Sequence, residues 1–76
     1  MSIKALSLVV LEKDLPSHGL LKGDVGTAVE IYPPDGIEVE FVTGSGKTQA
    51  LVTLKTTDLH LIGDAEILSV RRLDAA

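Results

Sequence analysis

The segment VTGSGKTQA, residues 42–50, carries the residues with the clearest potential for chemistry. Its Gly46-Lys47-Thr48 triplet is the ending of a Walker loop, in which backbone N–H groups and a lysine hold nucleotide phosphates between a strand and a helix. The complete G-x-x-x-x-G-K-[ST] motif needs a glycine at position 41, where this chain has Phe41. The residues that follow, TQALVTL, alternate as a strand does. We therefore predict a hairpin turn and no nucleotide site.

Three glutamates, Glu30, Glu38 and Glu40, are a second group with the chemistry of paired acid–base catalysts. Two strands of period two, joined by the turn PPDG, place Glu30 opposite Glu38 on an outer sheet face, where like charges repel. An exposed face has no sheltered pocket to shift a pKa, so we expect no catalytic residue there. The face is either solvated, with Lys47 or Lys55 offsetting the repulsion, or bound by a basic protein. We predict a protein-binding face that consists of Glu30, Tyr32, Glu38, Glu40 and Leu51.

The other chemistry-bearing residues are scattered. His18 and His60 are the only histidines and cysteine is absent, so a metal site would need carboxylates such as Asp14 or Asp64. No helical or hairpin spacing brings these residues together, and we expect no metal and no cofactor. Asp24, in KGDVG, is expected to accept backbone N–H bonds where a strand begins. An enzyme would need a pocket between subunits that contains Asp24 or His18.

Composition limits both the fold and the partners. A chain of 76 residues predicts one domain, residues 1–76, with few apolar side chains left over to line a deep pocket. A net charge of −4 disfavours nucleic acid, because phosphate contacts supply most non-specific affinity. No apolar run approaches the about 20 residues of a membrane span. With no signal-peptide cleavage site and no cysteine, we expect a cytoplasmic protein.

The pattern along the chain predicts an all-β domain. Short runs rich in Val, Ile and Thr alternate with turns that contain Gly and Pro, as in a small barrel or sandwich of five or six antiparallel strands. A long loop over 12–24 follows the first strand, and a 3₁₀ turn is expected near 56–59. A short terminal helix from Asp64 is the alternative to the last strand. The expected strands cover 6–11, 25–32, 36–42, 48–54 and 67–73.

A series of short motifs runs through nearly the whole chain. They are Asp14-Leu15-Pro16, Gly19-Leu20, Gly23-Asp24, Gly26-Thr27, Val39-Glu40-Phe41, Gly46-Lys47-Thr48, Thr53-Leu54 and Asp58-Leu59. In this order they resemble a family of short bacterial proteins that is catalogued as a domain of unknown function. The resemblance implies an SH3-like barrel and carries over no catalytic residue. Ala28 departs from the family's usual valine.

These observations favour a non-catalytic module that binds a protein partner, or itself, through the acidic face. An accessory or antitoxin-like role would fit such a module. The alternative is an RNA- or DNA-binding SH3-like barrel, since many such barrels bind RNA. That function requires the basic side chains to converge on one face: Lys4, Lys22, Lys47, Lys55, Arg71 and Arg72.

Overall fold

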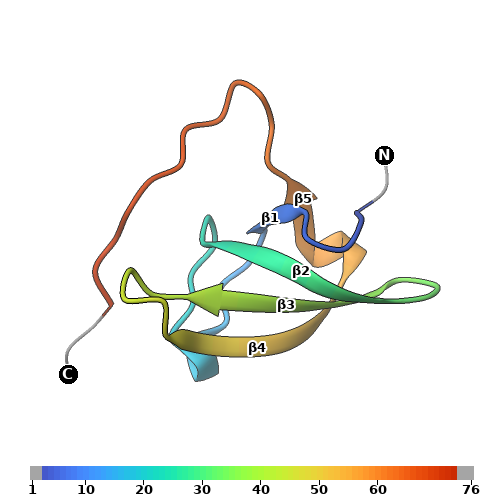
Figure 1. The fold of residues 1–76 in the computed structure, drawn as a ribbon, viewed down its shortest axis with the longest axis horizontal. Coiled ribbons are helices and arrows are strands. Elements are labelled where there is room, and N and C mark those ends of the chain that lie inside the picture. Colours follow the sequence, from blue (N-terminus) through green and yellow to red (C-terminus); the bar gives the residue numbers. More distant parts are fainter. Residues whose placement is uncertain (1–2, 74–76) are drawn as a thin grey trace.

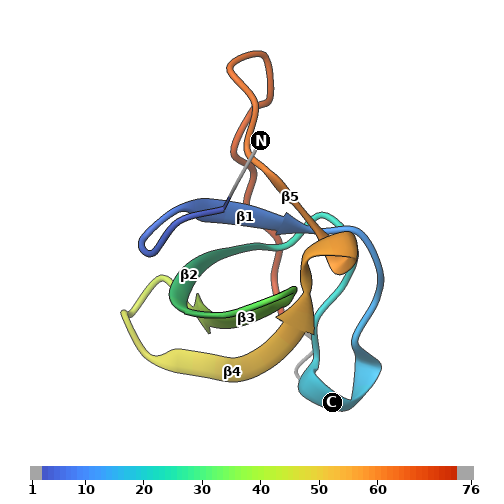
Figure 2. The same cartoon turned by 90° about the vertical axis from the view of Figure 1, so that its right-hand side faces the viewer.

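The computed structural model describes residues 3–73, which form one antiparallel five-stranded sheet (Figure 1). In the sheet the strands follow the order β4-β3-β2-β1-β5. The expected small all-β, SH3-like barrel is confirmed, because the sheet curls around a single apolar core (Figure 2). The strands are β1 (Leu8–Leu11), β2 (Val25–Tyr32), β3 (Gly36–Val42), β4 (Thr48–Lys55) and β5 (Leu59–Leu61).

The core is built from residues of all five strands and of the β1–β2 loop. Val9, Ala28 and Val39 have no exposed surface, and Leu11 and Ile37 are 1% exposed. Burying such side chains stabilises the fold by roughly 1.5–3 kcal/mol each. The remaining core residues are Leu20, Phe41, Ala50, Leu54 and Leu59.

A β-bulge in β2 decides which residues face this core. Ala28 pairs with Val39, whereas Glu30 pairs with Glu38, so Val29 is an extra residue on β2. An extra residue reverses the alternation of side chains along a strand. Ala28 before the bulge and Ile31 after it therefore both pack toward the core.

The loop between β1 and β2 is held by its own polar side chains. Asp14 Oδ1 accepts the Lys22 N–H at 2.8 Å, and Asp24 Oδ2 accepts the Leu21 N–H at 2.9 Å. A bridge between Leu15 and Leu20 encloses the 3₁₀ turn Pro16–His18, which the sequence did not predict. The aspartates thus fix the loop, as expected for Asp24, while Leu20 is buried in the core.

The hairpin predicted for GSGK is confirmed. β3 and β4 are antiparallel neighbours, and the turn closes with a hydrogen bond from the Thr43 N–H to the Lys47 carbonyl. Phe41 is 3% exposed and belongs to the core. The predicted 3₁₀ turn is also confirmed as Thr56–Asp58, where Asp58 Oδ2 accepts the Lys55 N–H.

The predicted boundaries of β1 and the predicted last strand are wrong. β1 begins at Leu8 because Leu6, with φ of 71°, lies in a turn. The last strand is Leu59–Leu61, which pairs with β1 and buries Leu59. Residues 62–73 form neither the strand 67–73 nor a helix from Asp64. Leu59 and Leu61 are the last residues to pack on the core, and Ile67, Leu68 and Val70 of the later segment are exposed.

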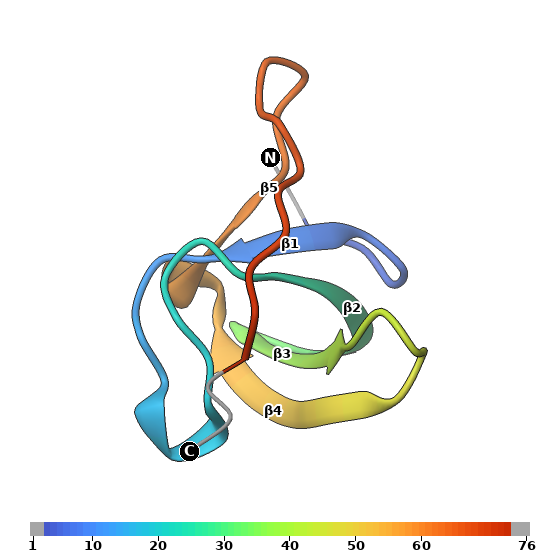
Figure 3. The ribbon, with the colours of Figure 1, turned by 90° about the vertical axis from the view of Figure 1, so that its left-hand side faces the viewer.

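Residues 62–73, the tail, instead leave the sheet in a loop and return past β1 and β2 (Figures 1 and 3). Val10 shows how close this passage is. It is 7% exposed but lies outside the core cluster, and it lines a cavity of about 210 Å³ together with Ile67 of the tail. The tail therefore faces the outer side of β1 across this cavity.

Replacement of Gly26 tests the packing of β2 on β3. A Cβ atom there would lie 2.6 Å from the Val39 side chain and 2.8 Å from Phe41. We expect Gly26→Ala to lower the free energy of unfolding by about 1–3 kcal/mol, the usual cost of overpacking, as measured by chemical denaturation. Gly44→Ala is the matched control, since nothing lies within 4 Å of its Cβ position. Equal stability of the two variants would contradict this account.

Candidate functional site

The five residues predicted to bind a protein lie on one outer surface of β2, β3 and β4. The predicted register is confirmed: Glu30 lies opposite Glu38, and Ile31 lies opposite Ile37. Glu40 lies opposite Leu51 on β4. Leu51 is 54% exposed and Tyr32 is 45% exposed, so apolar surface lies among the carboxylates. We call these five residues the acidic face: Glu30, Tyr32, Glu38, Glu40 and Leu51.

Hydroxyl groups, rather than cations, contact the carboxylates of the acidic face. The Tyr32 hydroxyl donates to Glu38 Oε1 at 3.2 Å, and Thr48 Oγ1 donates to Glu40 Oε2 at 2.6 Å. Desolvation of its hydroxyl, reinforced by Glu38, raises the pKa of Tyr32. Within residues 3–73 no ion pair involves these glutamates. The predicted offset by Lys47 or Lys55 is therefore not made by direct contact.

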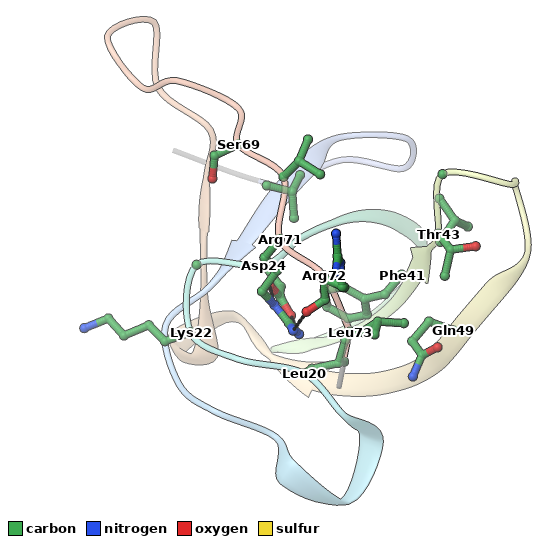
Figure 4. Close-up of a pocket in the computed structure, with 15 residues that line it drawn as sticks. Leu20, Lys22, Asp24, Phe41, Thr43, Gln49, Ser69, Arg71, Arg72 and Leu73 are labelled. Atoms are coloured by element: carbon green, nitrogen blue, oxygen red, sulfur yellow. Dashed lines mark hydrogen bonds and ion pairs between the residues drawn. The ribbon is translucent and has the colours of Figure 1, made fainter. Parts of the chain in front are cut away.

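A second polar centre joins the tail to the β1–β2 loop. The Arg71 guanidinium meets the Asp24 carboxylate with two parallel hydrogen bonds, Nε to Oδ1 and Nη2 to Oδ2, both 2.7 Å (Figure 4). Nη2 also donates to the Gly19 carbonyl at 2.9 Å. Paired charged hydrogen bonds of this kind are among the strongest polar contacts in proteins. Sequence reasoning missed this pair, because 47 positions separate its members.

The surroundings of Asp24 favour its ionised carboxylate. The hydrogen bonds from Arg71 are the largest influence and hold the pKa of Asp24 below its ordinary value, although burial opposes them. The Leu21 N–H lowers that pKa further. The Asp24 side chain is 16% exposed and that of Arg71 is 32% exposed, so water competes only partly for this contact.

A cavity of about 620 Å³ lies beside this ion pair. Leu20 and Phe41 line it from the domain, together with Gln49, and tail residues 69–73 line it from the other side (Figure 4). The small size of the chain led us to expect no such pocket. It exists because the tail supplies a wall, and its volume falls within the range of about 300–1,000 Å³ that is common for ligand sites.

The tail has a second polar anchor at His60. His60 Nδ1 contacts Glu12 Oε2 at 2.5 Å, and Nε2 contacts Glu66 Oε2 at 2.9 Å. The hydrogen bond with Glu66, and next the one with Glu12, raise the pKa of His60 above its ordinary value. The Gly63 N–H, followed by His60, lowers the pKa of Glu66. The imidazole thus links the β1–β2 loop, β5 and the tail.

The remaining predicted residues do not assemble into a site. Among residues 3–73, no group of three histidine or acidic side chains has the geometry to hold a metal ion. His18 lies in the 3₁₀ turn of the β1–β2 loop, whereas His60 lies on β5. Three of the basic residues, Lys22, Arg71 and Arg72, line the larger cavity. The other three, Lys4, Lys47 and Lys55, do not line that cavity.

Residues 5–61 match the model of the family described as "Domain of unknown function (DUF4926)". The chain belongs to this family. No curated protein and no solved structure gives a significant match. In the DUF4926 chain described here, no helix within residues 3–73 is long and apolar enough to cross a membrane.

The limits of the DUF4926 match divide the molecule into two parts. The matched residues contain all five strands, the acidic face and Asp24, and they end at the last residue of β5. Arg71 and Glu66 follow the matched segment. Asp24, Gly19 and His60, which the tail contacts, thus lie within the segment that matches the family, whereas the tail lies outside that segment.

Glu66→Gln tests the anchor at His60. We expect the pKa of His60 to fall relative to the unmodified protein, because its larger perturbing contact is lost. A raised pKa in the folded state means that these contacts stabilise the fold below about pH 6.5 and that this contribution disappears as the pH rises through the raised pKa. NMR titration of the imidazole C–H signals measures the shift. Glu40→Gln, on the acidic face, is the control and should leave the titration unchanged.

Arg71→Gln tests the ion pair with Asp24. We expect the pKa of Asp24 to rise, because the strongest cause of its depression is removed. In the unmodified protein this contact stabilises the fold above the ordinary carboxyl pKa and is lost as the pH falls through the lower folded value. The measurement is an NMR titration of the carboxyl carbon. Arg72→Gln removes the neighbouring charge only, and an equal shift in that variant would contradict direct pairing.

Proposed function

We propose that this DUF4926 domain is a non-catalytic interaction module, which binds a basic protein surface through the acidic face. The observation that carries the proposal is the placement of Glu30 directly opposite Glu38 on exposed strands. Like charges in this position destabilise a sheet by a few tenths of a kcal/mol or more. A cationic partner would remove that cost on binding, and this would favour the complex over the free domain.

The surroundings of the glutamates support a protein partner. Tyr32 and Leu51 place aromatic and aliphatic surface beside the charges, and interfaces commonly combine apolar contact with charge complementarity. The partner can be another protein or a second copy that presents a basic surface. An accessory or antitoxin-like role fits this mode of action. The absence of cysteine is in keeping with a bacterial cytoplasmic location, which is part of the proposal.

Glu30→Lys tests the proposal because it separates binding from stability. The new lysine would lie opposite Glu38, so we expect the free energy of unfolding to rise by about 0.2–1 kcal/mol while partner binding is lost. Capture of proteins on the immobilised full chain, compared with unmodified protein, measures binding, and chemical denaturation measures stability. Binding to the unmodified protein should also weaken as salt is raised.

Asp64→Lys is the matched control, since it makes the same change of charge at an exposed tail position outside the acidic face. A partner retained by this variant and lost by Glu30→Lys supports the proposal. Equal capture by the two variants would argue against it. Capture that ribonuclease abolishes would instead support the nucleic-acid alternative.

A further inference from the structure

The acceptors that surround Arg71 have the geometry of a guanidinium-binding site. The two Asp24 oxygens and the Gly19 carbonyl bind one side chain through three hydrogen bonds. A lysine has a single ammonium group and cannot reproduce the parallel pair with a carboxylate. The site therefore distinguishes arginine from other cations.

The DUF4926 domain builds this site without help from the tail. Asp24 is held by the Leu21 N–H, and Gly19 has a left-handed backbone with φ of 70° that directs the end of the 3₁₀ turn. The neighbouring Leu20 is buried in the core. Because contacts within the domain hold these acceptors, the loop needs little ordering when a ligand binds, and this reduces the entropic cost of binding.

The tail, in contrast, buries little apolar surface. Its residues form no helix or strand, and Ile67 and Val70 are 90% and 98% exposed. Docking consequently gains little from apolar burial and rests on polar contacts at Glu66 and Arg71. A segment held in this way can be displaced by another segment that offers the same guanidinium.

We propose that Asp24, Gly19 and the adjoining cavity lined by Leu20 and Phe41 form a recognition site for an arginine in an extended segment of a protein partner. In the same chain, the tail occupies this site through Arg71 and competes with the partner. Leu20 and Phe41, on the domain side of the cavity, provide apolar surface for the side chains next to that arginine. The partly buried Asp24 carboxylate repels phosphate, which selects peptide over nucleic acid. This site is separate from the acidic face, so either proposal can fail alone.

The experiment uses the full-length Arg71→Gln variant and a fluorescent peptide with the sequence of residues 62–73. We expect the peptide to bind Arg71→Gln at least about tenfold more tightly than the unmodified protein, because a tethered tail competes at an effective concentration in the millimolar range. Fluorescence anisotropy measures both affinities. Addition of Asp24→Asn to Arg71→Gln should weaken binding at least tenfold.

Two peptide variants provide the matched control. A peptide that carries Arg71→Lys should bind at least tenfold more weakly than one that carries Arg72→Lys, although the two have the same net charge. Equal binding of these peptides, insensitivity to Asp24→Asn, or no binding at millimolar peptide would each overturn the proposal. If Arg71→Gln does not fold, the fluorescent peptide is titrated with unmodified protein to millimolar concentration, and an unchanged anisotropy would overturn it equally.

Discussion

The fold depends on the close approach of β2 to the side chains of β3. Val39 and Phe41 occupy the space where a side chain at position 26 would lie, so only glycine fits there. β2 pairs with β1 on one side and with β3 on the other, and Val9 of β1 lies opposite Gly26. A domain of this size has a small core, and the absent side chain lets two large apolar residues reach it.

Much of the sheet was predictable because its signals are local. The strands 25–32 and 36–42 follow from alternating side chains on both sides of PPDG, and the structure has them with these bounds. The bulge at Val29 was not predictable, because an added apolar residue in an apolar strand leaves no mark in composition. The strand Leu59–Leu61 was missed because it is three residues long and contains a histidine.

The acidic face could be predicted from the sequence, whereas the contact between Asp24 and Arg71 could not. The register of two adjacent strands places Glu30 opposite Glu38, and a turn of known length fixes that register. The pairing of Asp24 with Arg71 depends on where an irregular segment of the chain returns to the domain. Such a path has no periodicity to read, so sequence reasoning recovered the structural role of Asp24 at the start of β2 but not its arginine.

The core and the tail are held in place by different kinds of interaction. The barrel is held by apolar burial, which sulfate and similar salts strengthen, whereas the tail is attached at Glu66 and Arg71 through charges that dissolved ions screen. A rising concentration of such salts therefore tightens one part while it loosens the other. The ionic composition of the surroundings sets how often the Asp24 carboxylate is uncovered, while the fold of the barrel stays the same.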